Sequence, residues 1–151
     1  MSKAVKTTVV LSLTCFVFLK CEDHRLEKVF FDQPPETRIE RLRKYSLADQ
    51  YKIFRYGHDV MHPPLMNLAK PIAERGAMAI PFLLEQLNSQ PDDITLLGVL
   101  LIFQTMARSK SCDVKSDAAL MSTLASKVSG MKDKEWQTIC LKRLQRIKDA
   151  T

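Results

Sequence analysis

The stretch DITLLGVLLIFQTMAR, residues 93–108, decides the fold class. Between Ile94 and Ala107 it contains no charged residue, and two aspartates, Asp92 and Asp93, stand at its start. Because aspartate is a preferred N-cap, one of these two is expected to begin a helix here. A helix that is apolar nearly all round is buried on every side. The stretch is also short for a bilayer, which needs about 20 apolar residues. It therefore predicts a central, buried helix.

Apolar residues recur at helical intervals on both sides of this stretch. A helix through AIPFLLEQL precedes it, and its apolar stripe is Ile80, Leu83, Leu84 and Leu87. A helix over 117–129 follows, with Gly130 as its expected C-cap. Asp133 is expected to cap a last helix. The residues expected on the inner face of that helix are Trp136, Cys140, Leu141, Leu144 and Ile147.

The N-terminal half of the chain has weaker helical signals. Residues 22–35 end in a proline pair and are expected to form an extended lead-in, followed by a short charged helix over 36–44. Ser46 has the spacing of a capping box and is expected to begin a helix that Gly57 ends. The His-Pro-Pro sequence at 62–64 is expected to interrupt helical structure. No strand or hairpin signal appears, so the predicted class is all-α.

Two segments of the chain repeat each other. The helices at 77–106 and 118–147 align at an offset of 41 residues, which pairs Asp92 with Asp133. A period of about 40 residues built from two helices is typical of HEAT and armadillo repeats. The segment GAMAIPFLLEQL also resembles the first helix of HEAT-like repeats, and the resemblance covers roughly residues 65–148.

The resemblance to HEAT-like proteins implies a specific architecture for residues 36–151. They are expected to form one all-helical domain of antiparallel helix pairs, stacked as a short right-handed α-solenoid. Only two units match well, whereas stable solenoids usually need three or more. A plain antiparallel helical bundle is therefore the alternative.

The N-terminal segment MSKAVKTTVVLSLTCFVFLKC, residues 1–21, has the layout of a secretory signal peptide. A basic start precedes an apolar run of 13 residues, which Lys20 closes. That run is too short to span a bilayer. Cleavage near Cys21 is expected, giving an exported protein, periplasmic or secreted, without a stable membrane span. The alternative is an uncleaved signal anchor on a membrane-associated subunit.

The charge and the cysteines bear on partners and compartment. The formal net charge is +6, but without residues 1–21 only 20 basic and 17 acidic residues remain. The case for a nucleic-acid partner is therefore thin. Cleavage would leave two cysteines, Cys112 and Cys140. An even number in an exported protein favours one disulfide between them. The alternative is two buried free thiols.

The segment YGHDVMHPP, residues 56–64, raises the question of a metal site. His58, Asp59 and His62 echo the H-E-x-x-H motif, in which a continuous helix places both imidazoles on one face. Here Pro63 disfavours helical backbone at His62. We therefore predict a loop, with metal binding or a metal-dependent enzyme as the alternative. The residues in this segment and just before it that are expected to form a contact surface are Arg55, Tyr56, His58, Asp59 and His62.

No catalytic signature appears elsewhere in the chain. There is no G-x-S-x-G, no P-loop and no glycine-rich phosphate cradle. The expected function is therefore non-enzymatic, without a cofactor: the protein binds another protein. An inhibitor or immunity-type role in the cell envelope is one concrete version of this prediction.

Overall fold

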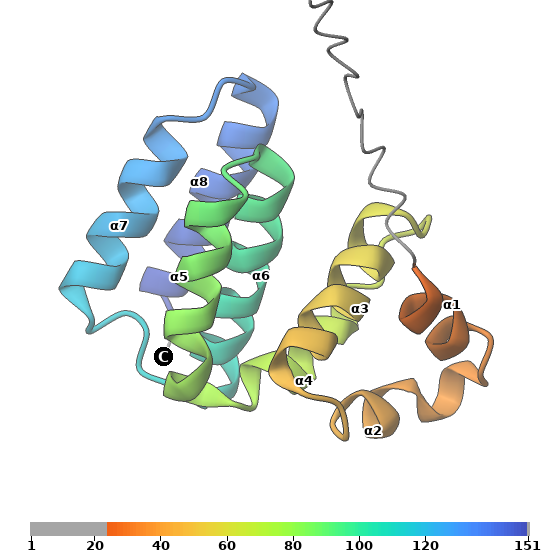
Figure 1. Cartoon of the computed structure of the whole chain (residues 1–151). Helices are drawn as coiled ribbons and strands as arrows, with labels where there is room; N and C mark the ends of the chain where they lie inside the picture. Colours follow the sequence, from red (N-terminus) through yellow and green to blue (C-terminus); the bar gives the residue numbers. More distant parts are fainter. Residues whose placement is uncertain (1–23, 151) are drawn as a thin grey trace, which may run out of the picture.

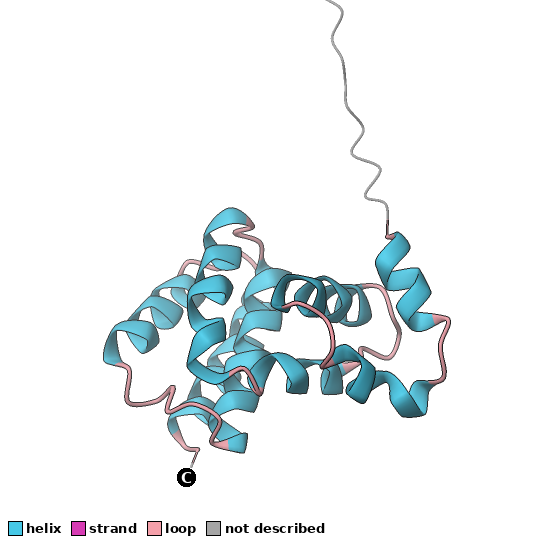
Figure 2. Cartoon of the chain, turned by 60° about the horizontal axis from the view of Figure 1, so that its bottom comes forward, coloured by secondary structure: helices cyan, strands magenta, loops and turns pink. Residues whose placement is uncertain are grey.

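The computed structural model describes residues 24–150, and these residues are helical and connected by short loops (Figure 1). No strand occurs in this part of the chain (Figure 2), which confirms the predicted all-α class. The α-helices are α1 (Arg25–Phe31), α2 (Arg38–Leu42), α3 (Leu47–Asp59), α4 (Ala69–Ala73), α5 (Ile80–Ser89), α6 (Asp93–Ser109), α7 (Ala118–Ser129) and α8 (Lys134–Lys148). Short 3₁₀ segments occupy Pro35–Thr37, Met66–Leu68 and Gly76–Ala79. The predicted signal peptide, residues 1–21, lies outside the described residues.

Helix α6 is the centre of the fold, as the uncharged stretch predicts. It contacts α3, α4, α5, α7 and α8, and every residue from Thr95 to Gln104 is buried. A helix surrounded in this way has almost no face for water, which explains why charged residues are missing from it. Among residues 24–150, no helix is both long enough and apolar enough to cross a membrane.

Three helices lie side by side in one layer: α6 contacts α4 on one side and α8 on the other. The helices α3, α5 and α7 pack against α4, α6 and α8, respectively, and α8 lies behind α5 and α7 in the view of Figure 1. Helices α6 and α8 run in the same direction. At their N-terminal ends, the backbone N–H of Asp133 donates to Asp93 Oδ2 at 3.3 Å. At their C-terminal ends, Arg108 and Ala150 line one cavity.

The helix caps confirm much of the sequence reading. Ser46 and Asp92 each accept a hydrogen bond from the backbone N–H three residues on, at 3.2 and 2.6 Å. Asp133 accepts from two N–H groups of the first turn of α8, and Gly130 is the C-cap of α7. Asp117, which the sequence reading placed inside a helix, caps α7 in the same way. Each such cap is worth about 1 kcal/mol.

The predicted lead-in over 22–35 is wrong, because α1 begins at Arg25. The helix forms because its aromatic residues pack on the rest of the N-terminal half. Phe30 is fully buried, with its ring centroid 6.0 Å from that of Tyr45. The ring of Phe31 lies 5.5 Å from that of Tyr56 on α3. A seven-residue helix of this kind depends on tertiary packing and not on its own propensity.

Gly57 does not end its helix, contrary to the prediction, since α3 continues to Asp59. The role of this glycine is to leave space. A Cβ at position 57 would lie 2.6 Å from Leu68 Cδ1 and 3.1 Å from Phe31 Cζ. The missing side chain therefore lets two other segments approach α3 closely. The chain leaves the helix only before the predicted break at 62–64.

Candidate functional site

Helix α3 carries four of the five residues predicted to form a contact surface, and the structure separates these four into two groups. Arg55, Tyr56 and Asp59 line a cleft of about 570 Å³. His58 is only 8% exposed and packs with its ring centroid 5.7 Å from that of Phe54. The fifth residue, His62, is exposed in the loop after α3 and does not line the cleft. The expected surface is therefore only partly continuous.

The cleft lies between α1, α3 and the C-terminal end of α5. Its polar lining residues are His24, Glu27, Tyr51, Lys52, Arg55, Tyr56, Asp59, Gln86 and Gln90. Tyr51 is 4% exposed, and its Oη has no hydrogen-bond partner. Burial raises the pKa of this hydroxyl, although the nearby Arg55 guanidinium opposes the shift.

A chain of polar contacts joins the wall of this cleft to α6. Arg55 Nε donates to Asp59 Oδ2 at 2.8 Å, and Arg55 Nη1 donates to the hydroxyl of Thr95 on α6. Thr95 in turn donates to the N-cap, Asp92, at 2.7 Å. His58 Nδ1 lies 2.9 Å from the other Asp59 oxygen. Arg55 therefore bonds both to its own helix and to the start of α6, which fixes α3 against the centre of the fold.

The electrostatics of this contact follow from its partial burial. Burial by itself would raise the pKa of the Asp59 carboxyl. Hydrogen bonds from His58 and Arg55 outweigh burial, so that the pKa of Asp59 lies below its usual value. Burial likewise opposes the charge on Arg55, yet the nearby Tyr51 hydroxyl and the bonded Asp59 carboxylate leave the pKa of Arg55 raised. The pair is charged at neutral pH.

The replacement Asp59→Asn is expected to lower the free energy of unfolding at pH 7 by about 1–3 kcal/mol, since it removes a charge-assisted bond to a half-buried guanidinium. A depressed folded pKa stabilises the protein above the unfolded value of about 3.9, and this contribution disappears as the pH falls through the folded pKa. The difference between wild type and variant should therefore shrink in urea titrations below about pH 4.

Asp32→Asn is the matched control for that titration. Asp32 is exposed, and its replacement is expected to change the free energy of unfolding by no more than about 0.5 kcal/mol. A loss in the Asp59 variant that is equally large at pH 3 and pH 7 would show that the carboxylate charge does not stabilise the fold.

The histidines do not assemble a metal site in the described residues. Between residues 24 and 150, no group of three histidine, cysteine or acidic side chains is placed to hold a metal ion. His58 is buried in the last turns of α3, whereas His62 precedes a cis peptide bond to Pro63 in the loop. As expected from that proline, one continuous helix does not carry both imidazoles.

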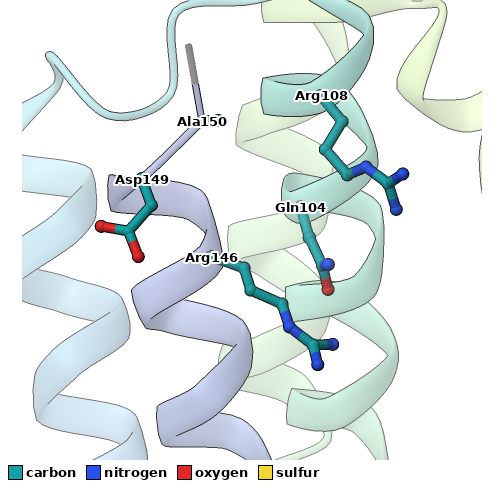
Figure 3. Close-up of a pocket in the computed structure, with 5 residues that line it drawn as sticks. All are labelled: Gln104, Arg108, Arg146, Asp149 and Ala150. Atoms are coloured by element: carbon teal, nitrogen blue, oxygen red, sulfur yellow. The ribbon is translucent and has the colours of Figure 1, made fainter.

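A second cavity, of about 490 Å³, lies between the C-terminal ends of α6 and α8 (Figure 3). It is lined by Gln104, Arg108, Arg146, Asp149 and Ala150. Arg146 extends from α8 toward α6 below Gln104 (Figure 3). Within the described part of the chain, neither Arg108 nor Arg146 forms a hydrogen bond or an ion pair. The one acid of the lining, Asp149, accepts a hydrogen bond from Gln145 at 2.8 Å.

Arg143 is the third guanidinium between these two helices. The sequence reading placed it mostly on the outer face of α8, but it is half-buried, and its Nη1 donates to Gln104 Oε1 at 3.1 Å. Its Nε is buried without a hydrogen-bond partner. Burial lowers the pKa of Arg143, and the positive charge of Arg146 lowers it further. The structure thus gathers three cations here, and the one acid that lines the cavity, Asp149, bonds to Gln145 and not to any of the three.

Large apolar side chains are exposed at the other end of the same two helices. Ile94 on α6 is 41% exposed, and Trp136 and Ile139 on α8 are 36% and 43% exposed. The placement of Trp136 on the inner face was therefore wrong, as was that of Leu141, which is 51% exposed on another side of α8. The inner face is formed by Cys140, Leu144 and Ile147.

These residues define a surface that we name the α6–α8 face. It consists of Ile94, Gln104 and Arg108 on α6 and of Trp136, Ile139, Arg143 and Arg146 on α8. On α8 the spacing is i, i+3, i+7 and i+10, which places all four residues on one stripe of the helix. This spacing could have identified the stripe from the sequence. It was missed because Trp136 was assigned to the buried face together with Cys140, Leu144 and Ile147.

The predicted disulfide is not formed. Cys112 and Cys140 are both free thiols in the described structure. Cys140 is fully buried on the inner face of α8, whereas Cys112 is half-buried in the loop after α6. Burial raises the pKa of the Cys140 thiol to about 11, so it remains protonated and packs as a small apolar group.

Comparison of the chain with models of protein families, with curated proteins and with solved structures finds no match.

Proposed function

We propose that the protein is a non-enzymatic, exported helical protein that binds another protein through the α6–α8 face. The observation that carries the proposal is the exposure of Ile94, Trp136 and Ile139 at one end of this face. Exposed apolar groups beside a polar rim are typical of interaction sites. Tryptophan and arginine are the residues that most often dominate binding energy at protein interfaces.

In this proposal the layered helices are two HEAT-like pairs, α5 with α6 and α7 with α8. Two features support it. Asp92 and Asp133, which stand 41 residues apart, cap α6 and α8 in the same manner. The two capped helices also lie side by side and run in the same direction. Equivalent helices of successive repeats stack in this way, and their common surface binds partners.

The polar network of α3 has a structural role in this proposal. Arg55, His58 and Asp59 bond to one another, and Arg55 also bonds to the start of α6. A group that acts in catalysis must reach a substrate, yet His58 is buried. The burial of His58 supports a structural role for this histidine, and it favours the proposed binding function over a catalytic one centred on it.

The proposed site of action is outside the cytoplasm, because of the signal-peptide pattern in residues 1–21. The partner would then be an envelope or secreted protein. If the bound helical protein blocked the active surface of that partner, its role would be that of an inhibitor or an immunity-type protein.

Photocrosslinking in the source cells tests this function. A photoreactive residue in place of Ile139 is expected to crosslink to a discrete partner, because it lies within the α6–α8 face. The same residue at Thr123 is the control, since Thr123 is exposed on α7 away from that face. The Ile139 crosslink should disappear when Trp136→Ser is added. Equal crosslinking from both positions, or none under several growth conditions, would contradict the proposal.

The same samples test export. The intact mass of the isolated protein is expected to lack approximately the first 21 residues, the segment with the signal-peptide pattern. Retention of the complete N-terminus would instead favour the membrane-anchored alternative.

A further inference from the structure

We propose that the α6–α8 face receives an acidic amphipathic helix of the partner protein. The apolar residues of that helix would lie against Trp136 and Ile139, and its carboxylates against Arg108 and Arg146. This inference rests on the proposed function and adds the chemistry of the partner segment.

The unmatched cations of the face carry the argument for an acidic partner. Helix α8 contains five basic residues and one acid. Arg108 and Arg146 have no described partner, and Arg143 keeps a buried Nε without one. A guanidinium binds a carboxylate with two parallel hydrogen bonds, which are about twice as strong as neutral ones. Arg108 and Arg146 are exposed, so a carboxylate supplied from outside can pair with guanidinium groups that have no partner within the described fold.

The apolar end of the face determines what else the partner segment carries. Trp136 and Arg146 are ten positions apart on α8, which corresponds to about 15 Å along a helix. A partner helix of about three turns spans that distance. It needs large apolar residues on one stripe at one end and acids on the same stripe at the other. Docking of such a helix into a groove between two helices is a common mode of peptide recognition.

Two other anionic partners fit the face less well. A nucleic acid would bind through its phosphates and leave Ile94 and Ile139 without a contact. A membrane-bound helix inserts a continuous apolar face into the lipid. The apolar face of α8, formed by Cys140, Leu144 and Ile147, is already buried against the rest of the fold. An acidic helix uses both ends of the face.

A titration with two synthetic peptides tests the inference. Both are fluorescein-labelled helical 18-mers with leucine and phenylalanine on one half of a stripe. One carries four glutamates on the other half, and the second carries glutamines there. Titrated by anisotropy against the protein as isolated from cells, the glutamate peptide is expected to bind at least about tenfold more tightly. This preference should weaken as the salt concentration rises.

Charge reversal identifies the residues responsible. The double variant Arg108→Glu and Arg146→Glu is expected to abolish the preference for glutamate. Neither side chain bonds to a described residue, so the fold should tolerate both changes. Lys148→Glu makes the same kind of charge change on the opposite side of α8 and should keep the preference.

Four outcomes would overturn the inference. They are equal affinity for the two peptides, a preference that survives the double reversal, no binding of either peptide, and binding of phosphatidylglycerol vesicles or duplex DNA in place of the glutamate peptide. If the Ile139 crosslink persists in any of these cases, only the acidic character of the partner is wrong. If that crosslink fails, the proposed function itself is wrong.

Discussion

Replacing Phe103 with alanine is expected to lower the free energy of unfolding by about 3–5 kcal/mol. Phe103 lies in the middle of α6 and is fully buried. Because α6 contacts five other helices, the cavity left by the ring cannot be closed by the movement of one neighbour. A domain of this size is stabilised by about 5–15 kcal/mol in total, so the loss is a large fraction. Urea unfolding followed by circular dichroism measures it.

Leu141→Ala is the control for that experiment. Leu141 is also a large apolar residue, but it is 51% exposed on α8. Its replacement is expected to change the free energy of unfolding by about 0.5 kcal/mol or less. A loss below about 1 kcal/mol for the Phe103 variant would contradict a close-packed core around α6.

The second large effect is expected at Gly76, where Gly76→Ala should cost about 2–4 kcal/mol. The backbone of Gly76 has φ of +57°, a conformation that costs a residue with a side chain about 1–2 kcal/mol. A Cβ here would also lie 2.7 Å from the carbonyl oxygen of Ser111, and backbone yields less readily than a side chain. The side chain of Ser111 donates to the carbonyl of Ala73 at 2.7 Å, so the two segments are tied at this point.

A matched variant at Lys110 is expected to change the free energy of unfolding in the opposite direction. It ends α6 with φ of 56°, and its side chain is exposed. Lys110→Gly is therefore expected to raise the free energy of unfolding by up to about 1 kcal/mol, since the strain disappears and no contact is lost. Thermal denaturation of Gly76→Ala and Lys110→Gly measures both changes in stability. A neutral Gly76→Ala would show that the approach to Ser111 relaxes without cost.

Composition alone was enough to predict α6, because a charge-free stretch of that length has few alternatives in a globular protein. The caps at Ser46 and Asp133 were also predictable, since capping depends on residues close in sequence. Helix α1 was not predictable in this way, because it is stabilised by contacts of Phe30 and Phe31 with distant residues. Gly57 was misread for the same reason: the need for its missing side chain comes from Leu68, on another segment.

In the candidate sites, too, features that depend on residues close in sequence were predictable, and features that depend on distant residues were not. Arg55, Tyr56 and Asp59 share a helix, so their common cleft follows from α-helical spacing. The disulfide prediction failed because cysteine number carries no information about distance. The α6–α8 face was missed because α8 has two stripes that both contain apolar residues, and only the packing of α6 shows which one is buried.

The affinity of the protein for the partner that crosslinking identifies, purified without the crosslink, tests the central claim most directly. Binding would be measured by titration calorimetry with the wild type, with the double variant Trp136→Ser and Ile139→Ser, and with Leu141→Ser as the control. If the α6–α8 face binds the partner, the double variant should bind at least about tenfold more weakly, while Leu141→Ser should bind as the wild type does. Unchanged affinity in the double variant would contradict the assignment of this face.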